Sequence, residues 1–153
     1  MKLGPLIEKY AGLHGLRVDV VAAQILQESS GNPLASRYEP GFYRRYLEGK
    51  ALTNHVPKSV PEALETHLRA TSFGLLQIMG QVAREQGFKG EWLTQLYDPE
   101  VNLQVCTKLL AKYVAQKNGD LRAGLLRYNG GGDPTYPDRI FKRIQNREHL
   151  SLF

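Results

Sequence analysis

Apolar and polar residues follow a helical period along most of the chain. In residues 20–33, Val21, Ile25 and Glu28 share one stripe of a helix, because side chains spaced by four and three residues lie on the same face. Gly31, which is soon followed by a proline, is expected to take the left-handed conformation that ends this helix. Glu28 therefore lies in the last turn, where the pattern calls for another aliphatic side chain.

Start and stop signals predict further helices. Prolines in a first turn, side chains that cap a helix and glycines that follow its last turn indicate where each one begins and ends. The predicted segments are a short aromatic-rich helix from Pro40 to Gly49, a helix at 61–70 with a capping box of Ser59 and Glu62, a helix at 81–87, the longest helix from Asp98 and Pro99 to about Asn118, a helix capped by Asp120 that ends at 127–134, and a last helix from about Pro137 that turns Ile140, Phe141 and Ile144 inward.

Strand-like alternation is scarce. Residues 71–80 form an apolar run that is too short for a helix and contains Gly74, so we expect an extended or irregular segment that enters the core. Residues 50–58 have the composition of a loop. The pattern predicts a mostly helical fold of the α+β type, with at most a small β-hairpin or irregular strand region around residues 50–80.

Composition indicates one folded domain. Of the 153 residues, 42% are hydrophobic and 23% are charged, and no stretch of linker composition divides them. These values are typical of a globular protein, so we expect a single domain over residues 1–153. Cys106 is the only cysteine, which excludes an intramolecular disulfide. Its place on the apolar stripe of the longest helix predicts a packing role.

Charge indicates a class of partner. The formal net charge is +5 and the pI is about 9.4, which favours an anionic partner such as nucleic acid, an acidic glycan or a membrane surface. The basic residues are scattered, so solvated helix faces explain them more simply. The chain shows no export signal and no apolar stretch long enough to span a membrane. We therefore expect synthesis in the cytoplasm and no membrane insertion.

Glu28 has the most distinctive chemistry. An ionised carboxylate on an apolar face is unfavourable unless it is paired or protonated, so we expect a raised pKa for this carboxyl group. A carboxyl group whose pKa approaches neutrality can donate a proton and take one back, as the acid of a glycosidase must. The plainer interpretation is a glutamate at a helix end that reaches water.

Glycoside cleavage ordinarily uses a second carboxylate. Each candidate is more simply explained as a helix cap or a surface charge; they are Glu39, Glu48, Glu62, Glu65 and Asp133. Glu39 is close enough in sequence to Glu28 to share a cleft with it. The four histidines and the single cysteine form no metal-binding motif, and residues 129–134 lack the features of a phosphate-binding loop. We expect neither a metal nor a cofactor.

Four motifs resemble those of the soluble lytic transglycosylases of the SLT type. They are ESSGNP at 28–33, SFGLLQIM at 72–79, YNGG at 128–131 and a following Tyr136, in the order and spacing of that family. The resemblance covers roughly residues 16–145, and the long gap between the first two motifs is similar to that of small phage-borne members. It implies a lysozyme-like fold and cleavage of peptidoglycan between N-acetylmuramic acid and N-acetylglucosamine. The family usually cleaves without water and leaves a 1,6-anhydro end.

The same resemblance implies roles for the residues of the first two motifs. Glu28 is the single acid and base, and Ser29 beside it helps to hold the glycan or the acid. Gly74 lets the backbone approach the substrate. Gln77 and Met79 line the cleft next to the scissile bond.

The remaining motifs imply substrate contacts by Tyr128, Asn129 and Tyr136, and Tyr136 is similar to the tyrosine that in this family lies near the catalytic acid. An asparagine offers a donor and an acceptor to an N-acetyl group, and a tyrosine offers a flat apolar face with a polar tip to a sugar ring. Core packing is the alternative for both tyrosines. The chain departs from the family beside Ser30, where an aromatic residue is common, and at Leu76, where methionine is common.

Three other functions remain open. A goose-type lysozyme-like hydrolase would combine Glu28 with a water molecule positioned by a second carboxylate such as Glu39. A wall-binding module would keep the fold without the reaction, and a nucleic-acid binder is suggested only by charge. We expect peptidoglycan strands as the partner, no nucleic acid, and a monomer that acts on the bacterial cell wall. It would do so as a phage endolysin, a virion component or a piece of a longer exported enzyme.

Overall fold

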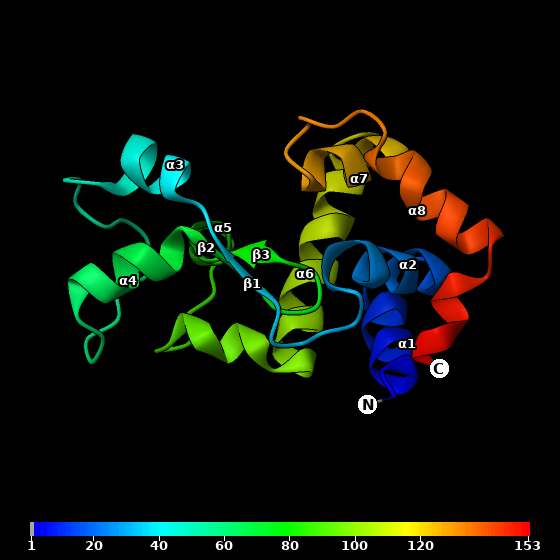
Figure 1. The fold of residues 1–153 in the computed structure, drawn as a ribbon, viewed down its shortest axis with the longest axis horizontal. Coiled ribbons are helices and arrows are strands. Elements are labelled where there is room, and N and C mark those ends of the chain that lie inside the picture. Colours follow the sequence, from blue (N-terminus) through cyan, green and yellow to red (C-terminus); the bar gives the residue numbers. More distant parts are fainter. Residues whose placement is uncertain (1) are drawn as a thin grey trace. The chain divides into compact units, whose positions relative to one another are not determined.

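Eight α-helices and a three-stranded sheet make up residues 2–153, the part of the chain described by the computed structural model (Figure 1). The residues form two units, each with its own interior contacts. The first unit holds both ends of the chain, up to Gly31 and from Cys106 onward, and the second unit holds Asn32–Val105. This composition of helices and a small antiparallel sheet confirms the predicted mostly helical class and is consistent with a lysozyme-like fold.

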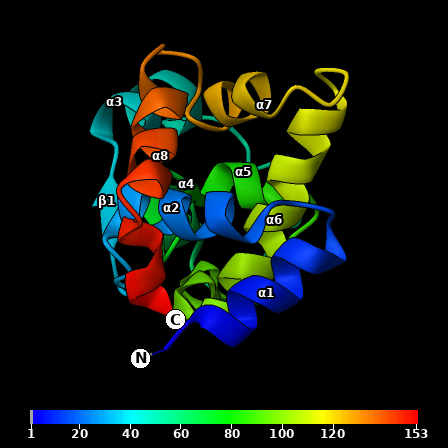
Figure 2. The same ribbon diagram turned by 90° about the vertical axis from the view of Figure 1, so that its right-hand side faces the viewer.

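The first unit is entirely helical. Its elements are α1 (Gly4–Leu13), α2 (Val18–Ser29), the second part of α6 (Pro99–Ala115), α7 (Leu121–Tyr128), α8 (Tyr136–Gln145) and a 3₁₀ helix, η3 (Glu148–Leu152). Figure 2 shows α8 running beside α2, with η3 continuing from it toward the chain terminus. The backbone N–H of Leu3 donates to the carbonyl oxygen of Leu152 at 3.0 Å, which ties the two ends of the chain together.

The interior of the first unit is built on α2. Its buried cluster takes residues from four helices: Val20, Ala23, Leu110, Leu125, Tyr136 and Ile140. Phe141 and Ile144 pack against this cluster while partly buried, as predicted for the last helix. Cys106 is fully buried, which confirms its packing role. Burying the apolar side chains of four helices together supplies the main favourable term in the folding of this unit.

The helix that carries Glu28 ends as its sequence predicts, with one difference. Val21 and Ile25 are fully buried, and Glu28 lies in the last turn of α2. The left-handed conformation begins at Ser30, with φ of 53°, and continues at Gly31, with φ of 79°. The helix therefore ends one residue earlier than a cap at Gly31 alone would require.

The second unit combines short helices with the sheet. Its elements are β1 (Ser36–Tyr38), α3 (Pro40–Phe42), a π-helix, η1 (Tyr43–Leu47), α4 (Glu62–Arg69), β2 (Thr71–Phe73), β3 (Ile78–Met79), α5 (Gly80–Glu85), a 3₁₀ helix, η2 (Leu93–Tyr97), and the first part of α6. The strands are antiparallel in the order β1-β2-β3, with Ser36 opposite Phe73 and Ser72 opposite Met79. The predicted extended segment is confirmed as the hairpin β2–β3, whereas β1 lies before the region in which strands were expected.

Two of the three predicted side-chain caps are present. Asp98 Oδ1 accepts from the backbone N–H groups of Glu100 and Val101 at the start of α6, and Asp120 Oδ1 accepts from the N–H of Ala123 at the start of α7.

The predicted capping box at Ser59 is wrong. Helix α4 begins at Glu62 with Pro61 at its N-cap, which leaves Ser59 outside the helix. The backbone N–H and the hydroxyl of Ser59 both donate to Glu91 Oε1 at 2.7 Å instead. A contact with a residue distant in sequence thus replaces the predicted cap of α4.

A membrane-spanning helix would need a long apolar run of residues. Within residues 2–153, no helix combines the length and the hydropathy needed to cross a bilayer.

Candidate active site

Glu28 and Tyr136 form the central contact of the site. Glu28 is half-buried in the last turn of α2, and Tyr136 is the first residue of α8. Pro137 suits the first turn of α8, which starts that helix at Tyr136. The tyrosine is only 1% exposed, and its hydroxyl donates to Glu28 Oε1. Tyr136 therefore belongs to the core and contacts Glu28 as well.

Gln24 extends this contact by one more side chain. It lies four residues before Glu28 on α2, is 1% exposed, and donates from Nε2 to the hydroxyl oxygen of Tyr136 at 3.2 Å. Reasoning from the sequence missed Gln24. Its spacing of four from Glu28 places both polar side chains on the same helix face, and that signal could have found it.

Cys106 and Tyr128 also lie within electrostatic reach of the Glu28 carboxylate. The Tyr128 hydroxyl and the Cys106 thiol are hydrogen-bonded to each other. Burial raises the pKa of Cys106 to about 12, and the negative charge of Glu28 adds to this effect. The pKa values of Tyr128 and Tyr136 are raised for the same reasons, chiefly by burial and further by the charge of Glu28.

These shifts describe the surroundings of Glu28. Helices α6, α7 and α8 each bring a protic side chain within electrostatic reach of the carboxylate. Thiols and phenols are protonated at neutral pH, and the raised pKa values of these three groups favour that form further. Neutral hydroxyl and thiol groups can donate hydrogen bonds without adding a positive charge. The site is a half-buried carboxyl group among neutral protic side chains.

The other predicted residues of the first unit lie at helix ends. Ser29 is half-buried, and its hydroxyl donates to the carbonyl oxygen of Ile25 at 3.2 Å. Tyr128 is the last residue of α7, and Asn129 follows it as an exposed C-cap. The first unit thus contains Glu28, Ser29, Tyr128, Asn129 and Tyr136.

Gly74 lies at a close approach inside the second unit. Its φ is +72°, and a Cβ there would stand 2.5 Å from Asn102 Nδ2 and 2.6 Å from the carbonyl oxygen of Leu96. Its backbone N–H donates to the carbonyl oxygen of Ala35 at 2.8 Å. The close approach that the sequence implied for this glycine is therefore made to Asn102 and Leu96.

Gln77 and Met79 complete the second motif. Gln77 has a positive φ of 47° and donates from Nε2 to the carbonyl oxygens of Ala35 and Gly74, both at 2.9 Å. These bonds hold the turn between β2 and β3 against the segment before β1. Met79 is half-buried at the end of β3, directly before α5. Gly74, Gln77 and Met79 all belong to the second unit.

Two of the candidate second carboxylates are ion-paired near the surface. Glu39, in the second unit, lies 2.5 Å from Arg37 Nε. Asp133 accepts from the N–H and the hydroxyl of Thr135 and pairs with Arg139 at 2.5 Å, which together lower the pKa of its carboxyl group. Both carboxylates are therefore held by an arginine. Glu48 and Glu62 are exposed.

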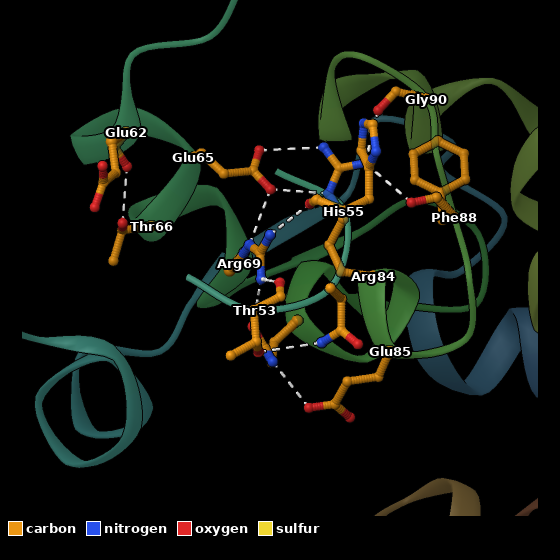
Figure 3. Close-up of polar contacts among 12 residues, drawn as sticks. Thr53, His55, Glu62, Glu65, Thr66, Arg69, Arg84, Glu85, Phe88 and Gly90 are labelled. Atoms are coloured by element: carbon orange, nitrogen blue, oxygen red, sulfur yellow. Dashed lines mark hydrogen bonds and ion pairs between the residues drawn. The ribbon is translucent and has the colours of Figure 1, made fainter. Parts of the chain in front are cut away.

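Glu65 contradicts its interpretation as a cap or surface charge. It is fully buried, and it accepts from Arg69 Nε at 2.9 Å and from Arg84 Nε at 2.8 Å (Figure 3). The two guanidinium groups also donate to backbone carbonyl oxygens of flanking loops, at Thr53, His55, Phe88 and Gly90. Glu65 therefore anchors loops on either side of α4 and α5.

Metal ligands would have to come from clustered side chains. Among residues 2–153, no group of three or more His, Cys, Asp or Glu side chains is arranged to hold a metal ion.

A comparison with protein families finds one matching family. The family model described as "Transglycosylase SLT domain" matches residues 5–139, a range that includes all the candidate site residues. No curated protein and no solved structure shows detectable similarity to the chain.

Proposed function

The chain belongs to the transglycosylase SLT domain family, and from this premise we propose that it cleaves the β-1,4 bond between N-acetylmuramic acid and N-acetylglucosamine with Glu28 as its single acid and base. At the level of the family, the activity is that of a peptidoglycan lytic transglycosylase, and peptidoglycan is the substrate. The match runs through both units, which supports the view that residues 1–153 act as one SLT domain.

The contact between Tyr136 and Glu28 carries the assignment of the acid. Glu28 is held by the hydroxyl of a neutral tyrosine, whereas Glu39 and Glu65 lie against arginines. An arginine beside a carboxylate favours its ionised form strongly. A carboxyl group among neutral protic groups can instead take up and release a proton during a reaction.

The reaction needs two proton transfers by the same residue. Neutral Glu28 first protonates the glycosidic oxygen as the bond breaks, while the N-acetyl carbonyl oxygen of the muramic acid stabilises the positive anomeric centre. Ionised Glu28 then takes the proton from the C6 hydroxyl of the same sugar, whose oxygen bonds to the anomeric carbon. The 1,6-anhydro ring closes and the acid is restored, so neither water nor a second carboxylate takes part.

The other site residues support this reaction in different ways. We propose that exposed Asn129 and half-buried Tyr128 contact the substrate, because an amide can bind an N-acetyl group and a tyrosine ring can lie against a sugar. Half-buried Ser29 would lie beside the glycan in the first unit, and we propose that half-buried Met79, in the second unit, also contacts the substrate. Gly74 and Gln77 would act by shaping the β2–β3 turn, since their polar groups bond within the second unit.

The substitution Glu28→Gln tests the proposal. It keeps the size of the side chain and removes the proton donor, so lysis of purified cell walls should fall by at least about 100-fold, the usual contribution of a general acid. Binding to the same walls should remain, measured by co-sedimentation. Glu8→Gln, at an exposed position of α1, is the matched control and should keep full activity. Retention of lytic activity by Glu28→Gln would contradict the assignment.

A further inference from the structure

Gln24, Tyr136 and Glu28 form a continuous chain of hydrogen bonds inside the first unit. The amide of Gln24 donates to the oxygen of Tyr136, and the hydroxyl of Tyr136 donates to Glu28. The SLT motif in this chain begins only at Glu28, so it assigns nothing to Gln24. We propose that Gln24 is a positioning residue that directs the hydroxyl proton of Tyr136 toward Glu28. The inference rests on the proposed role of Glu28 as the acid.

The direction of these two hydrogen bonds follows from the atoms in contact. The Nε2 group of a glutamine can only donate, so the oxygen of Tyr136 must accept at this contact. A phenol has one proton, and that proton is then left for Glu28 Oε1. Gln24 therefore decides which partner of Tyr136 receives the hydrogen bond.

This direction matters in both states of the acid. When Glu28 is neutral, an open lone pair on Tyr136 could accept the carboxyl proton and hold it away from the glycosidic oxygen. Gln24 occupies the acceptor side of Tyr136, which keeps the proton of Glu28 available to the substrate. When Glu28 is ionised, the proton of Tyr136 stabilises the carboxylate, and donation from Gln24 polarises and strengthens that bond.

Burial prevents water from taking the place of the Gln24 amide as a hydrogen-bond donor to Tyr136. Gln24 and Tyr136 are each 1% exposed, so water has little access to the contact between them. The polar groups of a buried amide are nearly always hydrogen-bonded. The contact joins α2 to α8, over 112 positions of the sequence, and meets Tyr136 at the same hydroxyl group that donates to Glu28.

The charged and titratable neighbours of the pair lie on other helices. Those whose contacts place them around α2 and Tyr136 are Cys106 of α6, Tyr128 of α7, Arg139 and Arg143 of α8, and Glu148 and His149 of η3. Among residues 2–153, no hydrogen bond or ion pair joins any of them to the amide of Gln24. A neutral substitution at Gln24 therefore changes the hydrogen-bond direction and leaves these charges in place.

The substitution Gln24→Met tests the proposal, because methionine has a similar volume and no donor. The expected kcat/KM on purified peptidoglycan is about tenfold lower, the effect of one lost hydrogen bond expressed as a rate. Without Gln24, Tyr136 should donate a weaker hydrogen bond to Glu28 and stabilise its ionised form less, which raises the pKa of Glu28. The alkaline limb of the pH profile of kcat/KM should therefore also move to higher pH. The melting temperature of each variant is measured in parallel.

Gln27→Met is the matched control on the same helix. Gln27 Oε1 accepts from Arg143 Nε at 3.1 Å, so this variant also loses one contact between α2 and α8. Its pH profile should keep the limb of the unsubstituted protein. If Gln24→Met lowers the rate at every pH without moving the limb, Gln24 has only a packing role and the proposal is wrong.

A double-mutant cycle with Tyr136→Phe gives a second decision. If Gln24 acts only through the hydroxyl of Tyr136, Gln24→Met should change nothing further in the Tyr136→Phe background. Equal losses of kcat/KM in both backgrounds would overturn the proposal. Should Tyr136→Phe be too slow to measure, the pH limb of Gln24→Met decides alone.

Glu28→Gln in the same assay separates the role of Gln24 from the proposed function. If Glu28→Gln stays active, the proposed function fails. If Glu28→Gln is inactive while the cycle is additive, only the role of Gln24 fails.

Discussion

At the scale of single residues, the buried thiol of Cys106 reports on the surroundings of Glu28. The thiol is fully buried, is hydrogen-bonded to Tyr128 and lies within electrostatic reach of Glu28. Burial favours the neutral form of a thiol, and a nearby negative charge favours it further. The same two causes raise the pKa values of Tyr128 and Tyr136. The reactivity of Cys106 therefore measures the effect of burial and of the Glu28 charge that all three groups share.

Cys106 should resist alkylation in the folded protein. With a pKa of about 12, roughly one thiol in ten thousand is ionised at pH 8, and the thiolate is the reactive form. Iodoacetamide at pH 8 should leave the native chain unmodified, and the same treatment in denaturant should modify it completely, as measured by the mass of the intact protein. Native modification at the rate of a small free thiol would contradict the burial described here.

The sequence predicts some of these residues better than others. Glu28 could be placed on a buried face because helical spacing and the family motif agree. Tyr136 had two competing interpretations, core packing and proximity to the acid, and the structure shows both together because one side chain can bury its ring and bond through its hydroxyl. Gln24 and Glu65 were missed or misread because periodicity indicates which face a residue is on, and not the partner that it meets there.

At the scale of secondary structure elements, local signals predicted the helices well and the strands less well. The caps of α6 and α7 involve residues three or fewer positions apart, so the sequence contains all the information they need. Strand β1 has only three residues, and it forms through pairing with β2, in which Arg37 lies opposite Ser72, 35 positions later in the sequence. A pairing of that kind leaves no periodic signal in so short a segment.

The buried ion cluster of the second unit is expected to dominate the stability of its loops. Glu65→Gln removes one negative charge and leaves Arg69 and Arg84 buried without their shared carboxylate. Breaking a buried pair in this way typically destabilises a protein by about 3–5 kcal/mol. Denaturant unfolding followed by circular dichroism measures the change.

A control on the same helix shows whether the effect comes from burial. Glu62→Gln, at the exposed start of α4, should change the free energy of unfolding by less than about 0.5 kcal/mol. Similar losses for both variants would show that Arg69 and Arg84 do not depend on Glu65.

At the scale of the whole molecule, the division of the chain could not be predicted from composition. The first unit consists of two separate stretches, and the chain returns to it at Cys106 within a continuous helix, α6. No proline-rich or glycine-rich linker marks such a boundary, because a helix crosses it. The class of the fold could be predicted, since it depends on the balance of helical and alternating patterns summed over all segments.

The net charge of +5 predicts a salt-dependent encounter with the cell wall. A positive protein approaches an anionic polymer faster at low ionic strength, and the effect is screened as salt is added. Lysis of whole walls should therefore slow between low and high salt, while the cleavage of short soluble glycan fragments changes less. Equal rates on whole walls at both salt concentrations would show that charge has no part in the approach.

The masses of the released fragments test the central claim most directly. If ionised Glu28 takes the proton from the C6 hydroxyl to complete the reaction, digestion of purified peptidoglycan yields 1,6-anhydro ends, each lighter by one water than a reducing end. Mass spectrometry of the digest should therefore find anhydro fragments as the main products of the unsubstituted chain and none with Glu28→Gln. Fragments that carry reducing ends, with one oxygen from labelled water, would contradict the account and identify a hydrolase.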